Sequence, residues 1–244
     1  MWTNQTIPKL ATATKLSSLL AKVAIGSGTT TPSASDTSLA SPIATANASK
    51  AKSASGNTLT IQCTATFTLS AANTIREVGL LASDDTLLWR DLVTPGVEVG
   101  AGHSVQVTVQ VQATLDDVVP STLTLVGAGT FNTTGGIFTA TQELADTIDE
   151  FLCVGGKQLA LHNTIGSLVV SPDTSWDEAP TISGTRVSKR YRSQQAPTGG
   201  VQVGQLRIAS PSLAVGHFKV TLNPILNLAA NDRVYLTVAV DYAL

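Results

Sequence analysis

A run of eight residues from Val105 to Gln112, in which valine alternates with a polar residue, constrains this chain more than any other stretch. A period of two places the valines on one face of a β-strand and the Gln and Thr side chains on the other. Such a strand covers a hydrophobic core on one side only. The run therefore predicts a strand with one buried and one exposed face.

Other segments before residue 115 have the same chemistry. Residues 57–69 alternate apolar residues with Thr and Gln, which predicts a second half-buried strand. Thr74–Leu81 and Leu87–Arg90 are apolar segments on either side of Asp84-Asp85, whose side chains favour a turn, so we expect a hairpin there. About five strands are predicted in this part of the chain, enough for an independent unit.

These segments also carry a resemblance. The sequence IREVGL at Ile75–Leu80, an acidic turn, LLWRDLV at Leu87–Val93 and a Val/Thr closing strand follow the upstream segments VAIGSGTT at Val23–Thr30 and DTSL at Asp36–Leu39. The pattern resembles small β-sandwich domains in virion proteins of tailed bacteriophages, including tail, baseplate and fibre components. The resemblance covers about residues 20–115. It implies a structural role, a homo-oligomer with a trimer as the default, and other virion proteins as partners.

The composition favours many closely packed strands. Ala, Thr, Ser, Val and Gly are abundant, and aromatic residues make up only 5% of the chain. Only 13% of the residues are charged, which is low for the surface of a soluble monomer and predicts an assembled protein. The net charge of −2 offers no basic field, so we expect neither nucleic acid nor a membrane as a partner.

The chain shows no targeting signal. Met1–Gln5 lacks the charged and then apolar layout of a signal peptide, and no apolar run is long enough to span a bilayer. We therefore expect synthesis in the host cytoplasm without a signal peptide, and a final location in the virion.

The predicted fold class is mainly all-β, with two β-sandwich-like domains, a short N-terminal helix and one short helix in the second domain. Residues 1–54 are predicted to form a helix at residues 8–24 and an extended arm from Gly26 to Ala54, which is rich in Ser, Thr, Ala and Pro. A β-sandwich with the N-terminal helix packed on it is expected at 55–117, and a second β-rich domain at 118–244. The boundary is placed where Asp116–Ser121 breaks the alternation.

In the second domain, Thr141–Leu152 has an apolar helical face and is followed by Gly155-Gly156, which predicts a helix. The expected strands are Gln158–His162, Ser167–Val170, Val201–Ala209, Phe218–Leu222 and Val234–Tyr242. Val99–Val111 overlays Leu228–Val240 without a gap. Two hypotheses explain this overlay: a second sandwich, or the general likeness of any two strands that follow a turn.

The most basic run lies in Thr185–Thr198, which is predicted to be a loop. Either it is solvated or paired with acidic residues of a neighbouring subunit, or it contacts phosphate or an acidic partner. Trp176 lies in a turn-rich segment that could present its ring to a sugar, so a host surface glycan is a candidate ligand. The candidate partner or receptor contacts are Trp176, Arg186, Lys189, Arg190, Tyr191 and Arg192.

No pattern typical of catalysis is found. The histidines, His103, His162 and His217, are dispersed, and neither Asp84-Asp85 nor Asp116-Asp117 extends into a calcium-binding loop. We therefore expect no enzymatic activity, no catalytic residue, no cofactor and no metal. Cys63 and Cys153 lie in apolar contexts and are predicted to be buried free thiols, with a single disulfide as the alternative.

These observations predict a non-enzymatic bacteriophage virion structural protein, from the tail, baseplate or fibre-attachment apparatus, that assembles through its β-domains and arm. Two alternatives remain open: a capsid decoration or cement protein, and a host-receptor or carbohydrate-binding module.

Overall fold

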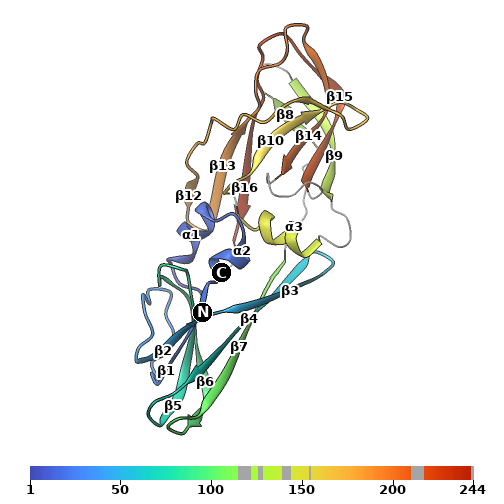
Figure 1. Cartoon of the computed structure of the whole chain (residues 1–244). Helices are drawn as coiled ribbons and strands as arrows, with labels where there is room; N and C mark the ends of the chain where they lie inside the picture. The colour runs from blue at the N-terminus through green and yellow to red at the C-terminus, as the bar shows by residue number, and fades with distance from the viewer. Residues whose placement is uncertain (115–121, 126–128, 139–143, 154, 210–216, 243–244) are drawn as a thin grey trace.

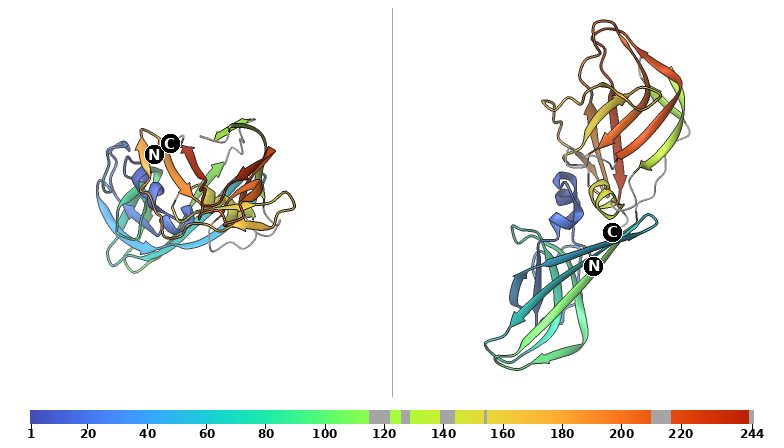
Figure 2. Two further views of the ribbon diagram at one scale, coloured as in Figure 1. Left: turned by 90° about the horizontal axis from the view of Figure 1, so that it is seen from above. Right: turned by 45° about the vertical axis from the view of Figure 1, so that its right-hand side comes forward.

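The computed structural model describes residues 1–114, 122–125, 129–138, 144–153, 155–209 and 217–242. Two β-rich lobes lie end to end, with the helices between them (Figure 1; Figure 2, right). The described sheets are antiparallel, and the prediction of a mainly all-β fold is confirmed. The three helices in the described residues are short: α1 (Thr6–Thr12), α2 (Leu16–Leu19) and α3 (Leu144–Phe151).

The first lobe is a sandwich of two sheets, with strand orders β2-β1-β5-β6 and β3-β4-β7. Inward side chains of both sheets, such as Ile25, Ile61, Leu80 and Val109, form one buried core. The strands are β1 (Lys22–Gly26), β2 (Pro42–Asn47), β3 (Ser49–Ser55), β4 (Thr58–Thr68), β5 (Asn73–Leu81), β6 (Leu87–Val99) and β7 (Ser104–Thr114).

The alternating segments form the predicted strands. Residues 57–69 correspond to β4 and Val105–Gln112 to β7, and the two strands pair in one unbroken register from Thr58↔Thr114 to Thr68↔Ser104. The expected hairpin is the β5–β6 pair. Because successive side chains alternate across the sheet, the apolar residues of β4 enter the core and its threonines face outward.

The prediction of an extended arm at residues 26–54 is wrong, because most of this segment is folded onto the sandwich. β2 pairs with β1 and β3 pairs with β4. Ala44 and Ala46 pack against the core although they are small. This segment is ordered by backbone hydrogen bonds to neighbouring strands and by contact with a core that other segments build. Its own small side chains give no sign of this order in the sequence.

The helix predicted at residues 8–24 is also different in the structure. It is divided into α1 and α2, and β1 begins at Lys22. Ala13 ends α1 with an extended backbone (ψ 150°), and Lys15 is extended as well. The β-branched residues Thr12 and Thr14 flank this break, where helix propensity is low.

The second lobe contains a sheet of order β11-β10-β14-β15-β9-β8 and a sheet of order β12-β13-β16. Leu161, Leu206 and Leu222 of the first sheet share a buried core with Tyr191 and Leu236 of the second, so the two sheets pack face to face. The strands are β8 (Thr122–Leu125), β9 (Gly129–Phe138), β10 (Gln158–His162), β11 (Leu168–Val170), β12 (Thr181–Ser183), β13 (Arg186–Arg192), β14 (Val201–Ala209), β15 (His217–Leu228) and β16 (Tyr235–Asp241).

The strands predicted for this lobe are found, and β10 and β14 have the predicted bounds. The prediction of a loop at Thr185–Thr198 is wrong, because this segment contains β13, the central strand of its sheet. The predicted helix is present as α3, and the first residues of the prediction, 141–143, lie outside the described residues. The predicted boundary at Asp116–Ser121 also lies outside them.

The helices connect the lobes. Ile7 and Ala11 of α1 pack against Val187 and Val240 of the second lobe, and Thr6 Oγ1 donates a hydrogen bond to the Leu88 carbonyl of the first. Ile148, Leu152 and Cys153, in and just after α3, belong to the core of the first lobe although they follow the predicted boundary.

A buried charged group reinforces this joint. Asp149 of α3, which is fully buried, accepts hydrogen bonds from the backbone and the hydroxyl of Ser17 and, at 2.8 Å, from Lys52 Nζ. Both cysteines are buried free thiols, as predicted. Burial raises the pKa of Cys63 to about 11 and that of Cys153 to about 12.

Candidate functional site

The strand β13 divides the predicted basic run between two faces of its sheet. Lys189 and Tyr191 are buried, whereas Arg190 and Arg192 lie on the outer face. Tyr191 belongs to the core of the second lobe, and burial raises the pKa of its hydroxyl. Lys189 pairs with Asp177 at 2.5 Å. The alternation of a strand thus removes Tyr191 from the set of candidate contacts.

The outer face holds an aromatic–arginine cluster of Trp176, Arg190, Arg192 and Tyr235. The rings of Trp176 and Tyr235 meet edge to face, with centroids 5.7 Å apart. The Arg192 guanidinium lies over the Trp176 ring at 4.9 Å, and that of Arg190 at 5.5 Å. Edge-to-face pairs and cations over a ring are both attractive because of the quadrupole of the π-system.

Acidic residues complete the cluster. Asp173 pairs with Arg192 at 2.7 Å and with Arg233 at 2.6 Å, and Glu178 pairs with Arg190 at 2.7 Å. The side-chain hydrogen bond from Ser175, together with those from the two arginines, lowers the pKa of Asp173 to about 2. Asp173 therefore stays ionised at neutral pH.

These contacts attach residues 172–178 to the β13–β16 sheet, with Trp176 as the central contact. Two guanidinium groups already stack on its ring, and Trp176 is only partly exposed. The groups that remain most accessible are Tyr235, which is 47% exposed, and Arg190. A ligand at this surface would meet a tyrosine ring beside an arginine and a glutamate.

The predicted contact residues are only partly brought together. Trp176, Arg190 and Arg192 cluster, but Arg186 lies at the other end of β13, where it pairs with Asp241 at 2.9 Å. Tyr235 was missed by sequence reasoning. It stands opposite Arg192 in the β13–β16 register, and only the pairing of these two strands, far apart in the sequence, could have identified it.

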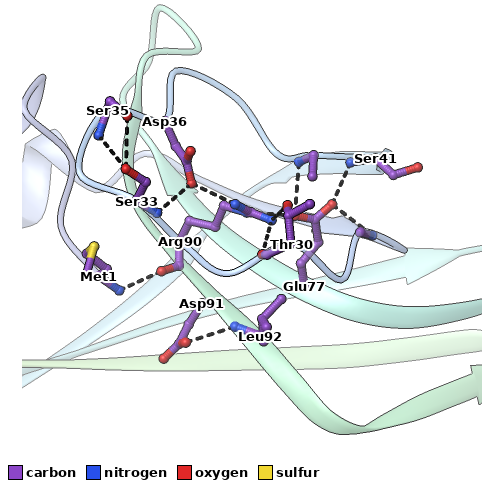
Figure 3. A network of polar contacts seen from close by, with 12 residues as sticks. Met1, Thr30, Ser33, Ser35, Asp36, Ser41, Glu77, Arg90, Asp91 and Leu92 are labelled. Atoms are coloured by element: carbon purple, nitrogen blue, oxygen red, sulfur yellow. Dashed lines mark hydrogen bonds and ion pairs between the residues drawn. The ribbon is translucent and has the colours of Figure 1, made fainter.

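A second polar site, the Glu77–Arg90 network, was also missed (Figure 3). Glu77 of β5 is fully buried, and its carboxylate accepts hydrogen bonds from the backbone N–H groups of Gly28, Ala40 and Ser41 at 2.7–3.0 Å. Arg90 Nε donates to Glu77 Oε2 at 2.7 Å. Burial would raise the pKa of Glu77, but these hydrogen bonds outweigh it and hold the pKa below its ordinary value of 4.5.

Arg90 extends the network to the loop between β1 and β2. Its Nη1 donates to Asp36 Oδ2 at 2.6 Å, and its Nη2 donates to the carbonyl and hydroxyl oxygens of Thr30 at 2.9 and 3.0 Å. Hydrogen bonds from the Ser33 backbone and from Arg90 lower the pKa of Asp36. A buried arginine thus has partners for each of its guanidinium nitrogens, as burial of the charge requires.

The glycines of the loop leave room for the carboxylate. A Cβ atom built on Gly26 would lie 2.4 Å from Glu77 Oε1, and one built on Gly28 would lie 2.5 Å from it. Neither position tolerates a side chain without movement of Glu77. The GSG, REVGL and WRD segments noted in the sequence therefore meet at one point of the fold.

The network is a structural site, because its two central charged groups, Glu77 and Arg90, are buried and are satisfied by each other and by the loop. Within the described ranges, no group of three or more His, Cys, Asp or Glu side chains is placed to hold a metal ion. None of the helices described above is long and apolar enough to cross a bilayer.

Comparison of the chain with protein-family models, with curated proteins and with solved structures found no match. A proposal about function therefore rests on the contacts described above. It also rests on the resemblance of residues 20–115 to small β-sandwich domains of phage virion proteins.

Proposed function

We propose that the chain is a non-enzymatic structural protein of a bacteriophage virion, a component of the tail, the baseplate or the fibre attachment. It acts by keeping a fixed shape while it binds copies of itself and neighbouring virion proteins. One observation carries this proposal. The segments that resemble phage virion domains, VAIGSGTT, IREVGL and LLWRDLV, meet in the Glu77–Arg90 network. These segments supply mechanical contacts inside the domain and present no reactive group.

The network suits a part that must keep its shape. Loops between strands are usually the most mobile elements of a sandwich. Here Arg90 and Glu77 hold the β1–β2 loop at Gly28, Thr30, Asp36 and Ser41, the residue before β2. A connector that transmits force between neighbours benefits from loops fixed in this way.

The joint between the lobes supports the same role. Lys15 pairs with the nearly buried Glu150 at 3.0 Å, and Lys52 reaches Asp149 of the same helix. Apolar packing of α1 adds to these charged contacts, because Ile7 and Ala11 pack on the second lobe and Leu10 belongs to the core of the first. The lobes are thus held by side chains on several elements, which favours transmission of a load along the long axis of the molecule.

The proposal is tested by disrupting the coding sequence in the phage that carries it and examining the particles. We expect particles that lack the tail, the baseplate or the fibres, or that fail to join heads to tails, and restoration by the intact chain supplied in trans. A chain with Glu98→Gln, a change at an exposed carboxylate of β6, is the control and should restore the particles as well as the intact chain does. Complete and infectious particles without the chain would contradict the proposal.

The aromatic–arginine cluster favours a second candidate function, a host-receptor or carbohydrate contact. The exposed Tyr235 ring could lie against the apolar face of a sugar, with Arg190 and Glu178 available for its hydroxyl groups. In this case Tyr235→Ala and Trp176→Ala should abolish adsorption to host cells and leave particle assembly intact. Thr237→Ala, an exposed position on the same face of β16, is the control. Unchanged adsorption of both variants would eliminate this function.

A further inference from the structure

The edge strands of the described sheets differ in how they are protected. An edge strand exposes unpaired backbone N–H and C=O groups, and proteins guard such edges with short length, prolines, charged residues or bulges. The other edges carry these features: Pro42 in β2, Pro95 in β6, Lys50 and Lys52 in β3, Asp241 in β16, and lengths of only 3 or 4 residues in β8, β11 and β12.

The strand β7 has none of them. It is 11 residues long and contains no proline and no charged residue. It pairs with β4 along its whole length without a register shift. Within the described residues, β4 is its only strand partner, so one side of β7 is an open edge.

The sheet face beside this edge is uncharged as well. Cross-strand hydrogen bonds between hydroxyl groups, Thr58–Thr114, Thr64–Thr108 and Thr68–Ser104, order its side chains at 2.8–2.9 Å. The outward residues of the three strands are Ser49, Ala51, Ser53 and Ser55 of β3, Thr58, Thr60, Gln62, Thr64, Thr66 and Thr68 of β4, and Ser104, Gln106, Thr108, Gln110, Gln112 and Thr114 of β7. A share of about 25–35% charged residues favours the solubility of an exposed surface, and none of these outward residues is charged.

The sequence of β7 is complementary to itself. In an antiparallel pair of two β7 strands centred on Val109, the register that uses the whole strand places Gln106 opposite Gln112 and Ser104 opposite Thr114. The valines of both strands then lie on the core side. Neutral residues face neutral residues of similar size along the whole strand, so the pairing meets no electrostatic repulsion.

The direction of β7 determines where the second lobes lie in this arrangement. β7 runs along the first lobe, and its C-terminal end lies on the side of the second lobe (Figure 1; Figure 2, right). In an antiparallel pair the two Thr114 ends point in opposite directions. The second lobes of the two copies therefore lie at opposite ends of the joined sheet.

We propose that the open edge of β7 is an interface between two copies of this chain, which pair antiparallel through β7 about Val109 and form one continuous six-stranded sheet. This inference rests on the self-association in the proposed function and not on the location in the virion. A two-fold pair, and not the trimer implied by the resemblance, is the assembly that it predicts.

Light scattering of the purified chain tests the pairing. The wild-type chain should have twice the 25.2 kDa chain mass. Thr108→Lys with Gln110→Lys puts lysine opposite lysine on both sides of the two-fold axis and should give a monomer. The matched control, Gln62→Lys with Thr64→Lys, places the same charges on the same face of the central strand and should leave the dimer intact. A monomeric or trimeric wild-type chain, or a dimeric edge variant, would overturn the proposal.

Cysteine cross-linking tests the register even if the lysine variant folds poorly. One chain carries Gln106→Cys and another carries Gln112→Cys, and they are oxidised separately and after mixing. The native thiols are buried and should remain silent. A disulfide-linked dimer should form in the mixture only, because each position lies about 20 Å from its own copy across the axis. A disulfide-linked dimer formed by either variant alone would contradict this register. The absence of a disulfide-linked dimer from all samples would contradict it as well. The mass measurement is unaffected by where the chain lies in a particle, so this inference and the proposed function can fail separately.

Discussion

Arg90 on β6 donates a hydrogen bond of 2.7 Å to Glu77 on β5, and the two side chains are 2% and 0% exposed. This ion pair lies under the β1–β2 loop and fixes that loop to the sheet. Each charge depends on the other and on the polar groups of the loop. Loss of one partner leaves a buried charge without compensation, which costs much more than loss of a surface pair.

Glu77→Gln should therefore lower the free energy of unfolding by about 3 kcal/mol or more. The amide keeps the shape of the side chain but lacks the charge that compensates Arg90. Urea unfolding measures the change, and Glu98→Gln at an exposed position of β6 should change stability by less than about 0.5 kcal/mol. Equal effects of the two substitutions would contradict the role assigned to the network.

Gly28→Ala should destabilise the first lobe by about 1–3 kcal/mol, because the added methyl group overlaps Glu77 Oε1. Gly199→Ala is the matched control, since nothing lies within 4 Å of a Cβ atom built there. Thermal melts of both variants test the prediction. A Gly28 variant as stable as the control would show that the loop adapts freely.

The pH dependence of stability follows from Glu77 and Asp36. Both pKa values are lowered in the folded chain, from ordinary values of 4.5 and 3.8. Their stabilising contribution is complete above these ordinary values and is lost as the pH falls through the lower folded values. The free energy of unfolding should decrease as the pH falls from about 5 to about 2, and Glu77→Gln should reduce the slope. Identical slopes for the variant and the wild type would exclude Glu77 as a source.

Asp149→Asn tests the joint between the lobes. The buried carboxylate accepts hydrogen bonds from Ser17 and Lys52, so its neutralisation should cost about 2–3 kcal/mol. Asp241→Asn removes a surface ion pair with Arg186, whose partners are 58% and 64% exposed, and should cost less than about 1 kcal/mol. Chemical unfolding measures the loss of stability in the two variants. A larger loss for Asp241→Asn than for Asp149→Asn would refute the role assigned to Asp149 at the joint.

The thiols should be inert in the folded chain. The pKa values of about 11 for Cys63 and about 12 for Cys153 leave almost no thiolate at pH 8, and both side chains are fully buried. A colorimetric thiol reagent should react with neither cysteine under native conditions and with both in denaturant. Fast reaction of a thiol in the folded chain would place that cysteine at the surface.

The sequence could predict strands whose own pattern reports their burial. β4 and β7 alternate without interruption, and the structure gives them the expected faces. β2 and β3 could not be recognised, because Ala, Ser and Thr mark no face and their order comes from neighbouring strands. β13 was mistaken for a loop because its charged residues hide the alternation of Val187 and Tyr191 toward the core.

The polar sites depend even more on contacts between distant segments. Glu77 and Arg90 are charged residues within apolar strands, a signal that each needs a buried partner. Asp36 and Thr30, the loop residues that bind Arg90, lie 54 and 60 positions upstream of it. Trp176 and Arg192 were named from local composition. Tyr235 and Arg233 join them only through the pairing of β13 with β16.

The proposed function places this chain in phage particles, and its most direct test is a reconstruction of such particles at side-chain resolution. We expect the chain to lie in the tail, the baseplate or the fibre attachment, with the β1–β2 loop held on Glu77 and Arg90. Density for the chain on the head lattice would instead support a capsid cement. Particles that are complete without any such density would contradict a structural role in the virion.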